Sequence, residues 1–328
     1  MTEGPDPGLI PEHLHRVLGS SWEIETEGTR LLVRNTRGDS PFVPSSRTLR
    51  WRALLAKLEN AYTMQGVERA GCLPLRWGRD TDLVVSAVQA LDPLLKDGAG
   101  ITHRQGFLPQ PVIRFTGRRD THGRLLDGFL TSFVNISHVR QIKDVREYAE
   151  TFDGWLSVLS RIGIHARHIT VSGDLKVWYR REVAGVTLRF HHAGLGLGDI
   201  VLLWNRNNPR RWAVDIGSGL ERLAWSRTRR PWPELVHGPF SNHADPETLD
   251  AVRSAVLLLG HGIPPSSRGA GAAIRRLVRS IPPDTARFGL SSLCRAYHRH
   301  WELFTPMKLG WPQITVLLEQ EIDRVNLK

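Results

Sequence analysis

The centre of the chain carries four short runs rich in β-branched and aromatic residues, and turns separate most of them. The runs are PVIRF at 111–115, FLTSFVNIS at 129–137, VTLRFHH at 186–192 and DIVLLW at 199–204. One long helix interrupts them, because apolar residues recur every three or four positions from Val145 to Ile162. Parallel strands need a crossover connection each time. The order therefore favours a mostly antiparallel sheet flanked by helices over a doubly wound one.

Helical patterns dominate the chain after Pro231. They cover TLDAVRSAVLLLG at 248–260, AAIRRLVRSI at 272–281 and ITVLLEQEIDRV at 314–325. An α+β domain followed by an all-helical C-terminal domain is the predicted architecture, with the boundary between residues 230 and 247.

Three local patterns precede the centre. Apolar and polar residues alternate from Trp22 to Val33 around Glu27-Gly28, which predicts a hairpin. Ser45 and Ser46 precede a stretch with helical apolar spacing and are predicted to cap that helix. A second helix is expected from about Thr81 to Lys96, opened by Asp82. The apolar positions of the first helix are Leu49, Leu54, Leu55, Leu58 and Tyr62.

Composition excludes several classes of protein. A chain of 328 residues with 41% hydrophobic and 23% charged residues is typical of a globular protein of about two domains. No apolar run approaches the ~20 residues that cross a bilayer, and no secretory signal pattern opens the chain, so we expect a cytoplasmic protein. Cys72 and Cys294 lack the spacing of a disulfide framework or zinc cluster.

The net charge is strongly positive, since 44 basic and 33 acidic residues give +11. Such a charge can attract nucleic acids. However, only six of the 44 basic residues are lysine, and an arginine excess also arises from codon bias in a GC-rich genome. Charge alone leaves nucleic-acid binding open.

Familiar nucleotide and metal signatures are missing. The sequence has no GxxxxGK[ST], and the glycines from Gly194 to Gly198 lack the strand-to-helix setting of a Rossmann fingerprint, which favours a turn or bulge there. His191-His192 and the pair His298 and His300 lack a third ligand at metal spacing.

Two segments carry residues suited to binding charged ligands. In the first, Gln110–Asp120, Arg114 lies inside an otherwise apolar strand, and a loop with Gly117, Arg118 and Arg119 follows. A guanidinium suits bidentate binding of phosphate or carboxylate. The alternative is a strand arginine that pairs with a neighbour in the sheet.

The second segment is AVDIGSGLERLAW at 213–225. A buried Asp215 is expected near the end of a strand, Gly217 and Gly219 let the backbone approach a ligand, and a helix then presents Glu221 and Arg222. Taken alone, the segment could be a strand-to-helix turn capped by its own side chains.

Together these segments resemble alanyl-tRNA synthetase, a class II aminoacyl-tRNA synthetase. The arginine-bearing strand, loop and strand resemble motif 2 of that class, and DIGSGLERLA closely resembles the motif 3 pattern DTGMGLERLA. Residues 253–281 are similar to the start of the family's helical tRNA-recognition domain. The resemblance implies an N-terminal extension at 1–48, a class II synthetase-like catalytic domain at 49–235 and a helical domain at 236–328.

The resemblance also implies a reaction: an amino-acid carboxylate attacks the α-phosphate of ATP and forms an aminoacyl adenylate. Arg114 takes the place of the motif 2 arginine that bridges α-phosphate and carboxylate, and Arg118 would assist at the phosphates. Arg222 matches the arginine that lies against adenine and reaches the γ-phosphate. Phe129 would offer an adenine platform, and Gly219 would keep the ATP site open.

The amino-acid site and the metal follow from the same resemblance. Asp215 matches the carboxylate that pairs with the substrate ammonium, Gly217 keeps the adjacent floor open, and Arg114 holds the substrate carboxylate. Alanine is the expected amino acid. Mg²⁺ is the expected companion of ATP, with no ligand residues assigned.

Departures from the family bear on the acceptor. Thr131 stands where the family has a glutamate, the motif 2 loop is shorter, and Ser266–Gly269 replaces an asparagine-containing loop that reads the tRNA acceptor stem. The sequence also ends at Lys328, without an editing domain. A small-amino-acid pocket discriminates by only ~1–3 kcal/mol per methylene, so translation enzymes of this kind need such a domain.

We therefore expect a stand-alone ligase that transfers the aminoacyl group to a small-molecule amine or hydroxyl in specialised biosynthesis. The first alternative is aminoacylation of a tRNA, which a basic helix with Arg275, Arg276 and Arg279 would support, although such a face is often merely solvated. The second is a non-catalytic paralogue that binds an amino acid or nucleotide and regulates a partner. Membrane and DNA are not expected partners, and the expected state is a monomer or small homo-oligomer.

Overall fold

The computed structural model describes residues 4–38, 41–286 and 289–326. The chain forms two compact units, each built from segments that are separated in sequence. The first unit comprises the described residues of Met1–Gly71, Ala87–Pro109 and Asn135–Arg229, and the second those of Cys72–Ser86, Gln110–Val134 and Arg230–Lys328. The second unit thus combines the C-terminal helices with the segment around Arg114, whereas the predicted division at 235/236 separates them along the chain.

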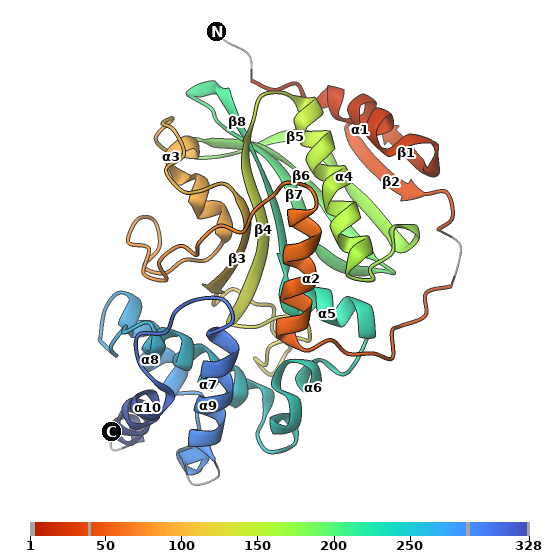
Figure 1. The fold of residues 1–328 in the computed structure, drawn as a ribbon. Helices are drawn as coiled ribbons and strands as arrows, with labels where there is room; N and C mark the ends of the chain where they lie inside the picture. Colours follow the sequence, from red (N-terminus) through yellow and green to blue (C-terminus); the bar gives the residue numbers. More distant parts are fainter. Residues whose placement is uncertain (1–3, 39–40, 287–288, 327–328) are drawn as a thin grey trace. The chain divides into compact units, whose positions relative to one another are not determined.

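A single sheet of eight strands is the main β-structure of the described residues (Figure 1). Its strand order is β1-β2-β5-β6-β7-β8-β4-β3, and the registered pairs are all antiparallel. The structure therefore confirms an α+β fold with an antiparallel sheet. The strands are β1 Trp22–Glu27, β2 Arg30–Asn35, β3 Gly106–Ile113, β4 Ser132–Ile142, β5 Ile169–Arg180, β6 Val183–His192, β7 Leu195–Asn205 and β8 Asn208–Gly219.

Three helices of the first unit pack together beside the sheet: α1 Ile10–Leu18, α2 Trp51–Thr63 and α4 Val145–Arg161 (Figure 1). The predicted helix at 145–162 is confirmed. Asp144 caps it by accepting a hydrogen bond from the Glu147 N–H at 2.9 Å. Its apolar face is buried, and Phe152 packs 5.1 Å from the Phe190 ring of β6.

The predicted N-terminal hairpin is confirmed as β1 and β2. Glu27 pairs with Arg30, which leaves Gly28 and Thr29 in the turn. Gly28 has a φ of +61°, a conformation that glycine adopts without steric cost.

Two predictions in the first hundred residues are wrong in part. Helix α2 begins at Trp51 with Arg50 at its N-cap, so Ser45 and Ser46 do not cap it; the predicted apolar positions from Leu54 to Tyr62 are nevertheless buried. The continuous helix from Thr81 to Lys96 does not form.

Instead, Arg76 and Leu83 form a β-bridge, and a short 3-10 helix, η3 Ala87–Leu91, leads into the single turn α3 Asp92–Leu95. Pro93 lies in the first turn of α3. Because proline cannot donate the backbone hydrogen bond of a helix interior, a longer helix through this position is excluded.

The C-terminal part of the second unit is helical, as predicted. Residues 248–260, 272–281 and 314–325 fall largely within three of its helices, whereas α9 was not predicted because its segment is rich in serine, arginine and histidine. The core includes Leu258, Ile274 and Trp301, all essentially inaccessible. The helices are α6 Trp232–His237, α7 Pro246–Gly260, α8 Ala270–Val278, α9 Leu290–Trp301 and α10 Trp311–Asn326.

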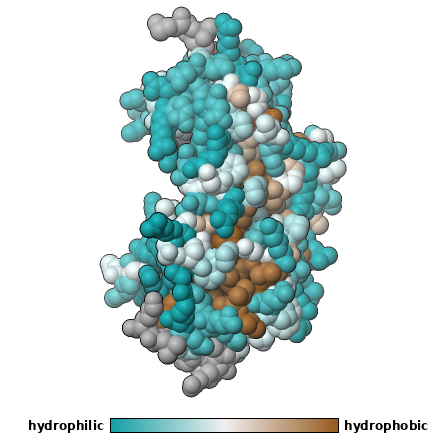
Figure 2. Space-filling view, turned by 90° about the vertical axis from the view of Figure 1, so that its left-hand side faces the viewer, coloured by the Kyte–Doolittle hydropathy of each residue, from teal (hydrophilic) through white to brown (hydrophobic). Residues whose placement is uncertain are grey.

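None of the described helices is both long and apolar enough to cross a membrane. The face drawn in Figure 2 is mostly hydrophilic, with hydrophobic residues gathered in part of it. Both cysteines are free thiols; Cys294 is buried and Cys72 is half-buried.

Candidate functional site

The segment around Asp215 forms the end of β8 and the start of α5 Leu220–Thr228. Gly219 is the N-cap residue of α5, so the strand continues four residues beyond Asp215 before the helix begins. Asp215 is buried, as predicted, and its carboxylate accepts a hydrogen bond from the Ser137 hydroxyl of β4.

The strand register places several polar residues on one face of the sheet. Gly217 lies directly opposite Asp199 of β7 on one side and Ser137 of β4 on the other. Residues two apart in a strand share a face, so Asp215 lies on the same face as these three residues. Asp199, Ser137, Asp215 and Gly217 together form the polar row. His138 points to the opposite face, where its ring meets Tyr62 of α2 at 5.5 Å. The row therefore lies on the face away from α2.

Gly217 lies beside two carboxylates and an amide. A Cβ atom at this position would lie 3.3 Å from Asp199 Oδ1, 4.0 Å from Asp215 Oδ2 and 3.8 Å from Asn135 Nδ2. The contact with Asp199 Oδ1 would be closer than ordinary van der Waals contact, so these groups approach Gly217 closely. Carboxylates only accept hydrogen bonds, so this pair suits a group that donates several, above all an ammonium.

The glycines of β7 hold the strands close together. Gly198 has a φ of +156°, and a Cβ on it would lie 1.9 Å from the Gly217 carbonyl oxygen. Ala193 and Gly194 form the turn between β6 and β7 with positive φ values, and the register shifts near His191. The turn and bulge favoured for the Gly194–Gly198 run are therefore confirmed.

Arg222 lies in the first turn of α5 and reaches back to β7. Its Nη1 donates to the Gly196 carbonyl oxygen at 3.1 Å, and His191 lies on the same side of Gly196. The side chain is half-buried, and this burial lowers the pKa of Arg222. An arginine nonetheless keeps its charge in proteins, so Arg222 supplies a positive charge near the polar row.

The segment around Arg114 belongs to the second unit. Strand β3 ends at Ile113, so the prediction that Arg114 lies inside a strand is wrong by one residue, and β4 begins at Ser132 rather than at Phe129. The Arg114 N–H donates to the Thr131 carbonyl oxygen at 2.7 Å. Its guanidinium donates to the Val85 carbonyl oxygen and lies 5.2 Å from the centre of the Phe133 ring.

The chain between these strands folds back on itself as a loop. Arg119 bridges to Leu125, and the Phe129 N–H donates to the Leu126 carbonyl oxygen at 3.1 Å. Arg118 is exposed and Phe129 is half-buried. A Cβ on Gly117 would lie 2.7 Å from Leu125 Cδ2, so the loop is tightly packed at that glycine.

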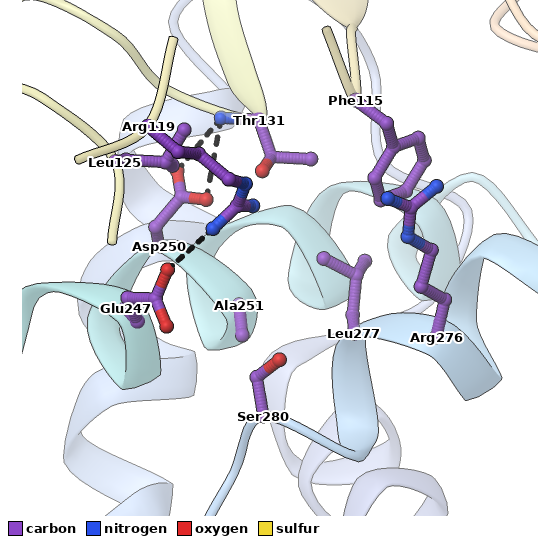
Figure 3. A pocket seen from close by; sticks show the side chains of 10 residues that line it. All are labelled: Phe115, Arg119, Leu125, Thr131, Glu247, Asp250, Ala251, Arg276, Leu277 and Ser280. Atoms are coloured by element: carbon purple, nitrogen blue, oxygen red, sulfur yellow. Dashed lines mark hydrogen bonds and ion pairs between the residues drawn. The ribbon is translucent and has the colours of Figure 1, made fainter. Parts of the chain in front are cut away.

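A small pocket, partly open to solvent, lies beside this loop in the second unit (Figure 3). Arg119 forms an ion pair with Glu247 at 2.6 Å, and the guanidinium of Arg276 stacks 4.4 Å from the Phe115 ring. The lining is Phe115, Arg119, Leu125, Thr131, Glu247, Asp250, Ala251, Arg276, Leu277 and Ser280.

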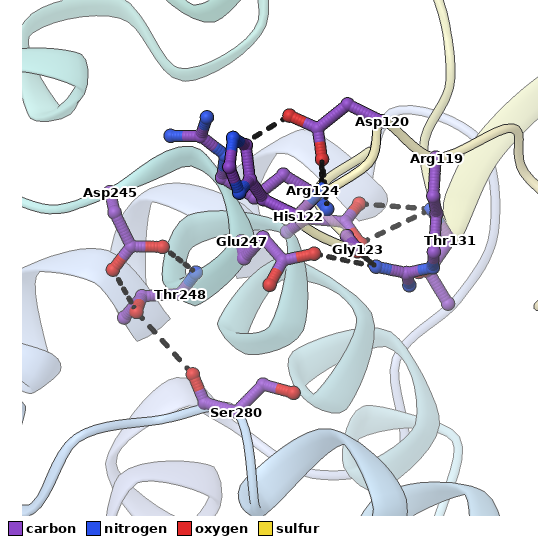
Figure 4. Close-up of polar contacts among 11 residues, drawn as sticks. Arg119, Asp120, His122, Gly123, Arg124, Thr131, Asp245, Glu247, Thr248 and Ser280 are labelled. Atoms are coloured by element: carbon purple, nitrogen blue, oxygen red, sulfur yellow. Dashed lines mark hydrogen bonds and ion pairs between the residues drawn. The ribbon is translucent and has the colours of Figure 1, made fainter. Parts of the chain in front are cut away.

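The polar contacts around this pocket are local (Figure 4). Asp120 accepts the backbone N–H groups of His122 and Arg124 at 2.9 and 2.8 Å. Asp245 caps α7 by accepting the Thr248 N–H at 2.9 Å. The loop and the first turn of α7 are thus each ordered by their own side chains as well as by the Arg119–Glu247 pair.

The predicted site residues therefore fall into two groups. Asp215, Gly217, Gly219 and Arg222 lie together in the first unit, on β8 and the first turn of α5. The other three, Arg114, Arg118 and Phe129, lie together in the second unit.

Sequence reasoning missed Asp199, Asn135 and Ser137. Their importance depends on which residues face one another across three strands, and that register is not visible in a single sequence. The alternation of apolar and polar residues along each strand indicates which residues share a face of the sheet. It does not indicate which residues of the neighbouring strands they meet.

Comparison with protein-family models gives no match for this chain, and comparison with curated proteins also gives none.

Proposed function

We propose that the protein is an aminoacyl-adenylate-forming ligase similar to the class II synthetases. Within that class we propose an alanyl-tRNA synthetase-like enzyme that activates a small amino acid, alanine foremost, with ATP and transfers it to a small-molecule amine or hydroxyl. The observation that carries the proposal is the pair of carboxylates, Asp199 and Asp215, that lies beside Gly217.

This pair of carboxylates is the proposed partner of the ammonium of an α-amino acid. Asp215 is buried, and in a medium of low dielectric its attraction to a positive charge is stronger than in water. The Ser137 hydroxyl already donates to one carboxylate oxygen of Asp215 and fixes its orientation. We assign Asp215 as the ammonium partner, Asp199 as a second acceptor, and Gly217 as the floor beside them.

The arginines supply the positive charge that adenylation needs. When the substrate carboxylate attacks the α-phosphate, pyrophosphate leaves and negative charge spreads over the phosphate oxygens, so catalysis rests on positioning and charge stabilisation. We assign Arg114 to the α-phosphate and the carboxylate, Arg118 to the phosphates, and Arg222 to adenine and the γ-phosphate. Phe129 and Gly219 complete the proposed ATP contacts.

Mg²⁺ would neutralise phosphate charge when bound with ATP. Among the described residues, no three His, Cys, Asp or Glu side chains are grouped so that they could hold a metal ion. We therefore assign Mg²⁺ no protein ligand and derive no step through it.

The arginines of the basic helix differ in their surroundings. Arg275 forms an ion pair with Glu321 at 3.3 Å, and Arg276 stacks on Phe115. Arg276 and Arg279 are both exposed, so tRNA stays the alternative acceptor.

ATP–pyrophosphate exchange tests the proposal. Wild-type protein should exchange with alanine or another small amino acid, without any need for tRNA. Asp215→Asn should raise the amino-acid KM and lower kcat, because it removes the charge that holds the ammonium. Glu150→Gln, which removes an exposed carboxylate from α4, is the matched control and should leave both constants unchanged.

Three outcomes would contradict parts of the proposal. An unaltered KM in Asp215→Asn would remove Asp215 from the amino-acid site. Acid-labile charging of total tRNA would establish tRNA as the acceptor. Binding of amino acid or ATP without exchange would support a non-catalytic regulator instead.

A further inference from the structure

Helix α7 carries two charged side chains that are almost completely buried. Asp250 and Arg253 are one helical turn apart and have exposed fractions of 4% and 1%. Both point to the chain at the start of β4, at Thr131 and Ser132, and all four residues belong to the second unit.

The two side chains bind the backbone of these residues. Both carboxylate oxygens of Asp250 accept the Thr131 N–H, at 3.0 and 3.2 Å (Figure 3). The Arg253 guanidinium donates to the Ser132 carbonyl oxygen, and the Ser254 hydroxyl donates to the Ser132 hydroxyl at 2.8 Å. Helix α7 therefore binds both the backbone N–H of Thr131 and the backbone carbonyl of Ser132.

The next hydrogen bond leads to Arg114. The Thr131 carbonyl oxygen accepts the Arg114 N–H at 2.7 Å. Asp250, the peptide groups of Thr131 and the backbone of Arg114 therefore form a continuous series of hydrogen bonds.

Arg253 is itself held rigidly. Its guanidinium stacks 4.3 Å from the centre of the Trp301 ring, and its Nη2 lies 3.0 Å from His300 Nε2. Burial and the charge of Arg253 lower the pKa of His300, so this histidine is neutral and can accept the bond. The Trp301 indole N–H donates to the Arg253 carbonyl oxygen at 3.0 Å.

Buried charged groups of this kind are a weak source of stability. Removing two charges from water costs several kcal/mol per ion, and well-packed apolar residues often replace such groups without loss. Asp250 and Arg253 do something that two apolar side chains could not do. They hydrogen-bond the backbone and so fix its position.

We propose that Asp250 and Arg253 are positioning residues that fix the start of β4 and, through Thr131, hold Arg114 in place for adenylation. This inference rests on the proposed function, in which Arg114 contacts the reacting groups. The helical segment then serves catalysis directly rather than only the binding of an acceptor.

A double-mutant cycle tests the inference in the full chain, with ATP–pyrophosphate exchange as the readout. Asp250→Leu keeps the approximate size of the side chain but removes both oxygens that accept the Thr131 N–H, and it should lower kcat about 100-fold, as expected when a reacting group is displaced by about 1 Å. In the Arg114→Lys background, the same substitution should lower kcat by less than about threefold, because its effect passes through Arg114.

Asp245→Ala is the matched control. It removes the N-cap of α7 and should lower the Tm while leaving kcat within about twofold. If Asp250→Leu does not fold, Arg253→Lys replaces it in the cycle, since lysine keeps the charge but loses the planar fork.

The outcomes separate the two proposals. Wild-type protein without exchange would overturn the proposed function and this inference with it. Active wild type with equal losses in both backgrounds, or with no loss in Asp250→Leu, would overturn the positioning role alone.

Discussion

At the scale of single residues, the candidate amino-acid site depends on the missing side chain of Gly217. Its φ lies outside the left-handed region, so a larger residue is compatible with the backbone there. The nearest atom to an added Cβ is Asp199 Oδ1 at 3.3 Å, the end of a flexible side chain. The backbone conformation of Gly217 therefore does not require glycine, and the close contact with Asp199 is what a side chain there would disturb.

Gly217→Ala should separate binding from folding. The methyl group would lie close to Asp199 and Asp215 and should raise the amino-acid KM about tenfold, the effect of about one methylene in a tight pocket. Its free energy of unfolding should change by less than about 1 kcal/mol. Calorimetric titration with alanine and urea unfolding measure the two quantities; unchanged alanine affinity would remove Gly217 from the amino-acid site.

Asp250 predicts a specific pH dependence of stability. Burial raises the pKa of Asp250 from 3.8 to about 6, against the opposing Thr131 hydrogen bonds and the charges of Arg253 and Arg119. Between these two values the folded protein binds more protons than the unfolded chain. The contribution of this carboxyl to stability therefore falls as the pH rises from about 4 to about 6.

Urea unfolding of wild type and Asp250→Asn from pH 4 to 7 measures this effect. The stability of wild type relative to the variant should fall across the window by about 2–3 kcal/mol, since each unit of pKa difference corresponds to about 1.4 kcal/mol. Other titrating groups are common to both proteins and cancel. A difference that stays constant with pH would contradict the buried, titrating Asp250.

At the scale of elements, the sequence predicted the parts that local patterns determine. Helix α4 and the β1–β2 hairpin are confirmed, because an amphipathic repeat and a turn glycine specify each of them locally. The helix predicted from Thr81 was wrong because apolar spacing was given more weight than Pro93.

The end of β3 and the polar row of the candidate site depend on information outside any one segment. Strand ends are set by pairing with neighbours, so Arg114 was placed one residue inside β3. Asp199 meets Gly217 only through the register of β7 and β8. Asp215 and Arg222 were found because their segment carries a recognisable pattern, whereas Asp199 stands in an ordinary strand.

Gly198 tests the contact between β7 and β8. Gly198→Ala would place a methyl group 1.9 Å from the Gly217 carbonyl oxygen and would adopt a φ of +156°, so it should destabilise the protein by at least about 2 kcal/mol. A much smaller change is expected for Gly217→Ala, on the neighbouring strand β8. Equal urea midpoints for Gly198→Ala and wild type would contradict the close approach of these strands.

At the scale of the whole molecule, the net charge of +11 does not by itself imply nucleic-acid binding. Arg253 is buried against Trp301, Arg275 and Arg119 are in ion pairs, and Arg276 stacks on Phe115. These four arginines thus each have a partner within the second unit.

Trapping of the activated amino acid tests the central claim most directly. Wild-type protein with ATP, Mg²⁺, alanine and hydroxylamine, and without tRNA, should produce alanine hydroxamate together with AMP and pyrophosphate. Arg114→Ala should reduce this product to background while the protein remains folded. A folded wild-type protein that yields no hydroxamate with any amino acid would contradict the account.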